Sequence, residues 1–314
     1  MPLLIEGEPF EWQPSMLAFI ETYPQFKDTA EEFFRRQAHH CAPIDLLYVN
    51  QREFAVTYPD DNVVRFLGSD DATTCHIIVI RHTGSGATGL SHLDGQGTEQ
   101  GIRDIITAIN ELSSESSEGR LEVHLFGGYC DEKRESERIS KQVLKILQDC
   151  PEDLHFITAC MSDLNDAVKN DTHWPTVYGI AVDVRSGEIF PATFSDKGPD
   201  QALRSVYTLF GEHDIRNIYD HKTGEHMITP FSYTSWPQAA IMLQQPDSFI
   251  RRHMSTSPNV EPPYFENHIR AALRWVLDHP NPAQTVFPGK KPRIYRKDKE
   301  GEWTEAKGNE SPSS

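Results

Sequence analysis

The chain has 314 residues, of which 38% are hydrophobic and 25% are charged, and its formal net charge is −17. This composition is typical of a globular protein. The negative charge repels phosphate backbones and anionic lipid surfaces, so we expect no nucleic acid and no membrane as partner, and we expect a monomer.

Cysteine usage and the first residues indicate a reducing compartment. No apolar run approaches the ~20 residues of a membrane span, and residues 1–8 lack the basic start and apolar core of a signal peptide. The cysteines are odd in number and scattered, with no Cys-x-x-Cys. We therefore expect free thiols in a cytoplasmic, and also nuclear, protein.

The first quarter of the chain predicts two helices followed by three short strands. Residues 14–38 have apolar side chains at helical spacing, with a break at Tyr23-Pro24. Turn-forming residues separate the strand candidates 46–50, 53–58 and 63–67. We expect these strands to form a meander that leads into the next hairpin.

The remaining elements are predicted by the same periodicities. Helical spacing occurs at 101–112, 131–150, 199–210 and 264–279. Strand patterns occur at 120–128, 154–161, 177–184, 189–194, 217–219 and 226–228. Residues 113–119 and 165–174 are polar and predict loops, and the proline-rich stretch 255–263 must be extended.

These elements predict an α+β fold. Helices do not alternate strictly with strands, and several strand pairs are local hairpins, so we expect a layered sandwich of a mixed or antiparallel sheet with helices packed on it. Residues 1–306 are expected to form a single catalytic domain. A C-terminal subdomain from about residue 258 is the alternative. Residues 307–314 are polar and expected to be disordered.

Residues 67–95 carry the pattern with the most chemical content. Cys75 follows a polar turn and precedes the apolar run 77–80, and three glycines then mark a turn before His92. This pattern predicts strand, turn and strand, in which the two outer ends lie side by side. A thiol beside an imidazole is the minimal requirement for thiolate catalysis.

Other arrangements of reactive residues are weaker. His76 directly follows Cys75, so its side chain should point to the opposite face of the strand. The spacing Gly84-x-Gly86-x-x-Gly89 matches the glycine motif of dinucleotide-binding loops. No helix is predicted after it, so we interpret it as a hairpin turn. No helix combines His-x-x-x-His with a glutamate, so we expect no metal and no cofactor. The other cysteines are interpreted as small buried or uninformative residues: Cys41, Cys130, Cys150 and Cys160.

Four motifs make the chain similar to the family of protein N-terminal asparagine amidohydrolases. They are Leu-Gly-Ser-Asp-Asp-Ala-Thr-Thr-Cys-His at 67–76, Arg-His-Thr-Gly-x-Gly-Ala-Thr at 81–88, Ser-Thr-Ser-Pro at 255–258 and Glu-Pro-Pro at 261–263. The first is highly specific, and the resemblance extends from residues 1–4 to residues 287–290. It implies hydrolysis of the side-chain amide of an N-terminal asparagine, in peptides and proteins that enter the N-degron pathway.

The resemblance also implies site residues. The family's nucleophile falls on Cys75. The core further resembles bacterial thiol deamidases of glutamine, whose histidine lies in a Gly-x-x-His context, here ending at His92, and whose hydroxyl residue lies six positions before the cysteine, here Ser69. The mechanism implied is that His92 helps to hold Cys75 as a thiolate, that Ser69 orients the imidazole, and that a thioester forms.

Substrate recognition requires an acceptor for the free α-ammonium group. The acidic residues closest in sequence to the nucleophile are Asp70, Asp71 and Asp94, although turn capping explains them equally well. Main-chain amides near Thr74 and Cys75 are candidates for stabilising the oxyanion. We also expect the trimmed N-terminus at Pro2 to pack near the site.

Two other functions remain open from the sequence. The same chemistry would serve a deamidase or transglutaminase of internal glutamine or asparagine. A non-catalytic module that binds a peptide N-terminus would require the same recognition without turnover.

Overall fold

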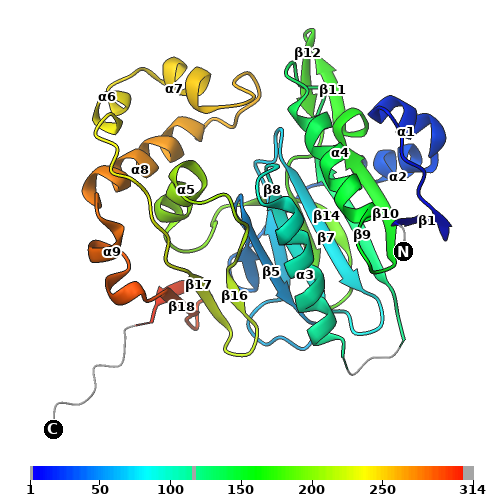
Figure 1. The fold of residues 1–314 in the computed structure, drawn as a ribbon, viewed down its shortest axis with the longest axis horizontal. Coiled ribbons are helices and arrows are strands. Elements are labelled where there is room, and N and C mark those ends of the chain that lie inside the picture. The colour runs from blue at the N-terminus through cyan, green and yellow to red at the C-terminus, as the bar shows by residue number, and fades with distance from the viewer. Residues whose placement is uncertain (1–2, 115–117, 307–314) are drawn as a thin grey trace.

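The computed structural model describes residues 3–114 and 118–306, which form a mixed α/β fold with several sheets (Figure 1). The largest sheet has eight strands in the order β15-β5-β8-β7-β9-β10-β1-β2, with both parallel and antiparallel pairs. Its strands are β1 (Leu3–Ile5), β2 (Glu8–Pro9), β5 (Glu53–Thr57), β7 (His76–His82), β8 (Thr88–Leu93), β9 (Leu121–Gly127), β10 (Leu154–Met161) and β15 (Arg216–Asn217).

Two smaller sheets and one isolated hairpin complete the β structure of the described residues. The five-stranded sheet, in the order β3-β14-β13-β6-β4, consists of β3 (His39–Cys41), β4 (Leu46–Tyr48), β6 (Phe66–Ser69), β13 (Ile180–Asp183) and β14 (Ile189–Phe194). The four-stranded sheet consists of β16 (Tyr219–Asp220), β17 (Glu225–Ile228), β18 (Arg293–Lys297) and β19 (Trp303–Glu305). The hairpin consists of β11 (Asp166–Lys169) and β12 (Thr172–Pro175).

The helices occupy both halves of the chain. They are α1 (Met16–Thr22), α2 (Gln25–Phe34), α3 (Thr98–Leu112), α4 (Glu135–Gln148), α5 (Gln201–Phe210), α6 (Ala239–Leu243), α7 (Asp247–Met254), α8 (Phe265–Asp278) and α9 (Pro282–Thr285), with short 3₁₀ helices η1 (Ser162–Asn165) and η2 (Pro288–Lys290). None of the helices in the described ranges has the length and apolar character needed to cross a bilayer.

The eight-stranded sheet is covered on both faces. On one face lie α3 and α4 (Figure 1): Gly89 of β8 leaves room for Ile105 of α3. On the other face lies the five-stranded sheet, since Ser69 of β6 contacts His92 of β8. Both faces of β7 are therefore buried, which explains why its sequence is a continuous apolar run rather than an alternating one.

The expected meander over residues 46–67 is wrong. β4 and β6 pair in parallel within the five-stranded sheet, whereas β5 pairs with β8 in the eight-stranded sheet. All five residues of β5 are buried, so the period-2 alternation that would reveal its sheet partner is absent.

The polar stretch 165–174 is also not a loop, as the sequence had suggested. It folds into the β11–β12 hairpin, whose turn residues Asn170 and Asp171 both have positive φ, at 52° and 59°. A two-residue turn of this kind needs left-handed backbone at both positions, which Asn and Asp tolerate. The Asn170-Asp171 pair is therefore the feature of the sequence that could have predicted this hairpin.

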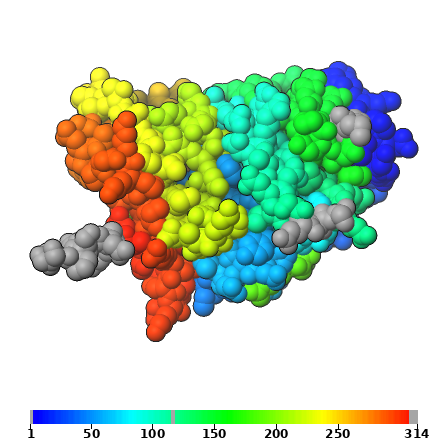
Figure 2. Space-filling model, turned by 60° about the horizontal axis from the view of Figure 1, so that its bottom comes forward, coloured from blue at the N-terminus to red at the C-terminus, as the bar shows by residue number. Residues whose placement is uncertain are grey.

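The C-terminal third has apolar clusters of its own. One contains Leu203, Val206, Phe231, Val276 and Phe287, and none of these belongs to the cluster under the large sheet. Figure 2 shows that the segments coloured yellow to red gather at one end of the molecule, away from the blue N-terminal segment. Whether this region folds as a separate subdomain stays a prediction.

A buried ion pair fastens this C-terminal region to the large sheet. The guanidinium of Arg204 in α5 donates to Glu53 Oε1 of β5 at 2.8 Å and to Oε2 at 2.5 Å, and it also donates to the main-chain oxygens of Tyr48 and Lys197. The Arg204 side chain is 1% exposed. Four hydrogen bonds to groups on other segments therefore hold this guanidinium in place.

We expect Arg204→Met to lower the free energy of unfolding by about 3–5 kcal/mol, because it leaves the Glu53 carboxylate buried without a counter-charge. Chemical denaturation would measure the change. The matched control is Arg103→Met, which breaks an exposed pair with Glu99 and should cost less than about 1 kcal/mol. Equal losses in the two variants would contradict this account of the docking.

Candidate functional site

A cavity of about 610 Å³ opens where β7 begins and β8 ends. Its floor comes from the segments that surround these strand ends, and its opposite wall comes from α5, α8 and the loop between α7 and α8. Its lining includes both predicted reactive residues, Cys75 and His92. The cavity is large enough to hold the first residues of a peptide.

The predicted hairpin around Cys75 is present. β7 and β8 pair antiparallel with Ile77 opposite His92 and His76 opposite Leu93. Cys75 lies two positions before Ile77, so its side chain and that of His92 share one face of the sheet and lie diagonally across the strand pair. The thiol is half-buried and the imidazole is 3% exposed.

His92 is held by Ser69, the hydroxyl residue that was predicted from resemblance. Ser69 Oγ and His92 Nδ1 are 2.9 Å apart, and Ser69 is fully buried. The second ring nitrogen, Nε2, is buried and has no hydrogen-bond partner among the described residues. With Nδ1 engaged by a fixed hydroxyl, the ring orientation is defined and Nε2 is left free to exchange a proton.

The electrostatics of the free site favour a neutral thiol and a neutral imidazole. Burial lowers the pKa of His92 to about 4, with Asp94 and Asp71 opposing this shift. Burial also raises the pKa of the Cys75 thiol, and the charges of Asp94 and Glu261 raise it further. Desolvation penalises both charged forms, and the expectation that His92 helps to hold Cys75 as a thiolate stays a prediction.

The predicted carboxylates Asp70 and Asp71 have cationic and phenolic partners. Lys197 Nζ lies 2.5 Å from Asp70 Oδ1 and 2.5 Å from Asp71 Oδ2. Tyr48 donates to Asp70 at 2.6 Å, and Tyr264 donates to Asp71 at 2.7 Å. The two carboxylates thus form a network that joins the nucleophile segment to the C-terminal region.

The third predicted carboxylate, Asp94, is also paired. Its Oδ2 accepts hydrogen bonds from Arg52 Nε at 2.6 Å and from Gln51 Nε2 at 2.8 Å. Its Oδ1 accepts from the main-chain N–H of Gln96, as in a turn cap. Asp94 therefore caps a turn and also lines the cavity, and its role as acceptor of the α-ammonium group stays a prediction.

Thr74 connects the nucleophile to a distant loop that sequence reasoning left unassigned. Thr74 Oγ1 lies 2.8 Å from Thr256 Oγ1, and the Ser257 hydroxyl donates to Thr73 Oγ1 at 2.8 Å. The same loop carries Glu261 into the cavity. In the sequence this loop was marked only by the motifs at 255–258 and 261–263. These motifs contributed to the family resemblance but did not indicate where the loop lies in the fold.

The expected placement of Pro2 lies outside the described residues. Its neighbour Leu3 pairs with Leu154 at the start of β10. Cys75 lies beside the opposite end of that sheet, where His76 pairs with Gly127. The first described residue is therefore at the far end of the strands from the thiol.

The remaining reactive side chains lie elsewhere. His76 points to the opposite face, as predicted, and contacts Ser140 of α4. Cys130, Asp166 and His173 could in principle hold a metal ion, since their ligand atoms lie within 4.8 Å of one another. Asp166 already accepts hydrogen bonds from the Cys130 main chain and pairs with His173, so these groups satisfy one another.

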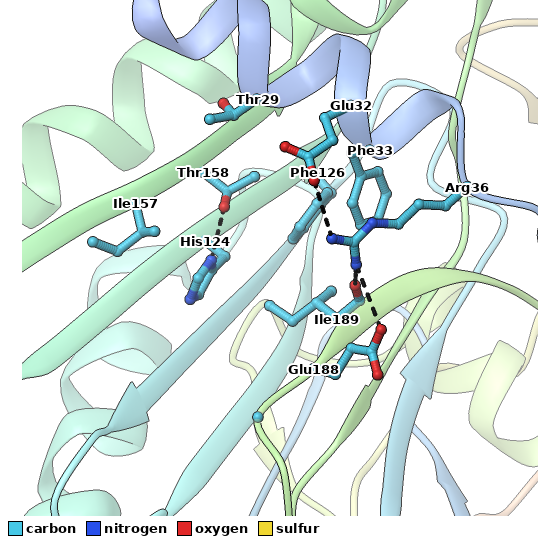
Figure 3. A pocket seen from close by; sticks show the side chains of 11 residues that line it. Thr29, Glu32, Phe33, Arg36, His124, Phe126, Ile157, Thr158, Glu188 and Ile189 are labelled. Carbon is cyan, nitrogen blue, oxygen red and sulfur yellow. Dashed lines mark hydrogen bonds and ion pairs between the residues drawn. The ribbon is translucent and has the colours of Figure 1, made fainter.

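A second cavity, of about 330 Å³, lies between α2, the β9–β10 pair and residues 187–189 (Figure 3). Arg36 lies between Glu32 at 3.8 Å and Glu188 at 3.7 Å, so its charge is neutralised. His124 is 2.9 Å from the Thr158 hydroxyl, and burial lowers its pKa to about 4. Among the described residues no thiol lines this cavity, and the cation there is already paired, so it offers no comparable chemistry.

Comparison with known proteins gives one consistent result. The family model described as protein N-terminal asparagine amidohydrolase matches residues 36–305. The proteins of that name from Sus scrofa and Homo sapiens are each 42% identical to the chain, over 97% and 96% of its length and 98% and 97% of theirs. The protein of that name from Arabidopsis thaliana is 28% identical over 82% of this chain and 80% of its own length.

Proposed function

Because the chain belongs to the family of protein N-terminal asparagine amidohydrolases, we propose that it hydrolyses the side-chain amide of an N-terminal asparagine and releases ammonia. The observation that carries the proposal is the cavity that contains Cys75 and the free Nε2 of His92. Its substrates are peptides and proteins with a free N-terminal asparagine, and we propose that it meets them in the cytoplasm and the nucleus.

The proposed first half-reaction forms a thioester. His92 Nε2 takes the proton of the Cys75 thiol, and the sulfur attacks the carboxamide carbon of the substrate. The carbon–nitrogen bond then breaks, the imidazolium gives its proton to the departing nitrogen, and ammonia leaves. Ser69 acts as a positioning residue because it fixes the ring through Nδ1.

The second half-reaction returns the enzyme to its starting state. His92 takes a proton from water, the hydroxide equivalent attacks the thioester carbon, and the sulfur leaves and recovers its proton. The product is an N-terminal aspartate. Main-chain N–H groups of Thr74 and Cys75 donate to no other main-chain group in the described part of the chain, so they are available to the oxyanion.

A free substrate amine is the feature that separates this function from deamidation of internal residues. We expect ammonia release from an Asn-initiated peptide, and a loss of about 10- to 100-fold or more when that peptide is N-acetylated. A charged hydrogen-bonded contact contributes about 1.5–3 kcal/mol, and the acetyl group must also be accommodated. A coupled ammonia assay on the paired peptides would measure it. Full activity on the blocked peptide would refute the proposal in favour of an internal-residue deamidase or transglutaminase.

A further inference from the structure

The cavity around Cys75 has an excess of negative charge. Five carboxylates line it among the described residues, and Glu261 is the one for which the structure gives no salt-bridge partner. The four paired carboxylates and their partners are Asp70 and Asp71 with Lys197, Asp94 with Arg52, and Glu135 with Arg138.

The contacts of Glu261 leave half of its carboxylate open. Oε1 accepts hydrogen bonds from the hydroxyls of Ser255 and Ser257, whereas Oε2 accepts none from a described residue. The nearby Arg251 is held by Glu266 and by the main-chain oxygen of residue 261. Burial raises the pKa of Glu261, and the charge of Arg251 only partly opposes this shift. A carboxylate that is partly desolvated, oriented by hydroxyls and not engaged in a salt bridge is an acceptor prepared for a cation.

The position of Glu261 relative to the nucleophile is fixed. The loop that bears it is tied to the residues before Cys75 by the Thr74–Thr256 and Thr73–Ser257 hydroxyl contacts. Glu261 is also close enough for its charge to raise the pKa of the Cys75 thiol. Its carboxylate and the sulfur therefore face the same space from different elements.

We propose that Glu261 binds the α-ammonium group of the substrate and thereby couples substrate binding to ionisation of Cys75. This inference rests on the proposed function and adds its specificity residue. Only three covalent bonds separate the amine nitrogen of asparagine from its carboxamide carbon, so the amine acceptor must lie close to the attacking sulfur. Glu261 meets that requirement, and its Oε2 is free to accept a hydrogen bond among the described residues. The predicted candidates Asp70, Asp71 and Asp94 are already paired with cationic side chains.

The coupling follows from the charges that face the sulfur. In the free protein, Asp94 and Glu261 disfavour the thiolate, and Arg52 and the Thr74 hydroxyl favour it. An ammonium group on Glu261 cancels one of the two unfavourable charges and adds a positive charge near the sulfur, so transfer of the thiol proton to His92 becomes easier. A blocked amine brings no such charge, and the thiol then remains protonated.

The first experiment compares Glu261→Gln with Glu225→Gln, a matched control that removes a partly buried carboxylate, paired with Arg296, outside the cavity. For an Asn-initiated peptide, we expect Glu261→Gln to raise KM by about 10- to 100-fold and to lower kcat, and Glu225→Gln to change each by less than about threefold. The preference for free over N-acetylated peptide should collapse in Glu261→Gln alone. If Asp94→Asn abolished that preference and Glu261→Gln kept it, Asp94 would be the acceptor and the inference would be overturned.

The second experiment needs no turnover. The pH midpoint of Cys75 alkylation by iodoacetamide, located by mass spectrometry, is measured with and without a peptide whose first alanine carries an N-terminal guanidinium group, and with the N-acetylated peptide. A guanidinium keeps its charge where the raised pKa of the thiol is titrated, whereas an α-ammonium loses its proton at about pH 8. In the wild-type protein the guanidinium peptide should lower the midpoint by about 1 pH unit or more, and the acetylated peptide should not. Glu261→Gln should have a lower midpoint without ligand and should show no further shift.

The two experiments separate the inference from the proposed function. An alkylation shift that requires Glu261, in a protein that releases no ammonia, would support amine binding and refute the amidase. Ammonia release with no alkylation shift, and with normal kinetics in Glu261→Gln, would support the amidase and refute the role of Glu261. A lower rate of alkylation from steric cover by the peptide does not affect the midpoint, which is the quantity compared.

Discussion

Replacement of Cys75 by alanine should abolish ammonia release from an Asn-initiated peptide, with a fall in kcat on the order of 10⁴-fold or more. The reason is that the proposed thioester has no other thiol from which to form: among the described residues Cys75 is the thiol that lines the site cavity, and Cys41, Cys150 and Cys160 are buried elsewhere. A steady-state ammonia assay gives the rate, and circular dichroism with a denaturation curve verifies that the variant is folded.

The matched control is Cys130→Ala, because Cys130 is the other half-buried thiol of the described residues and lies outside the cavity. It should retain wild-type kinetics. Trapping of substrate acyl groups on the wild-type protein but not on Cys75→Ala, observed by mass spectrometry after acid quench, would identify the thioester itself. Turnover that persisted in Cys75→Ala would remove the nucleophile assignment, and a wild-type protein that bound the free amine without any turnover would indicate the non-catalytic recognition module.

Replacement of His92 by alanine should lower kcat by about 10²- to 10⁴-fold, the usual contribution of a positioned general base and acid. Burial holds the pKa of this imidazole at about 4, so the ring is neutral at pH 7 and can accept the thiol proton through the unpartnered Nε2. The measurement is again ammonia release from an Asn-initiated peptide.

The control for His92 is His124→Gln. His124 is half-buried, its pKa is also lowered to about 4 by desolvation, and it hydrogen-bonds a hydroxyl, but it lies in the second cavity. It should affect stability without changing kcat of the folded protein. Ser69→Ala should give a smaller loss than His92→Ala, since the ring stays present and loses only its support at Nδ1. Equal rates in His92→Ala and the wild-type protein would contradict the acid–base role.

Local patterns explain which parts of the fold and site were predictable. The β7–β8 hairpin was predicted because a continuous apolar run and a glycine-marked turn lie within 20 residues of each other, and its register brings Cys75 and His92 to one face. The division of β4, β5 and β6 between two sheets was not predictable. Strands that are buried on both faces do not alternate between apolar and polar residues, so the sequence does not show which face packs on the core.

The sequence failed to predict two residues of the site for a different reason. Lys197 and Glu261 reach the cavity region from more than 100 residues beyond Cys75, and their positions depend on how the C-terminal region docks. That docking is made by contacts such as Arg204 with Glu53, which have no period or spacing in the sequence. A lysine or glutamate in a polar segment is most often a surface residue, so only the tertiary structure distinguishes these two.

The two walls of the cavity have a consequence for biosynthesis. Cys75, His92 and Ser69 come from the first third of the chain, whereas Glu261 and the threonine and serine hydroxyls that hold its loop come from the last fifth. A nascent chain that has emerged from the ribosome only as far as α5 would carry the sulfur and the imidazole but no carboxylate to receive an amine. The protein would thus become active as an amidase only near the end of translation. Proteolytic loss of the residues beyond α7 would inactivate the enzyme while leaving its nucleophile intact.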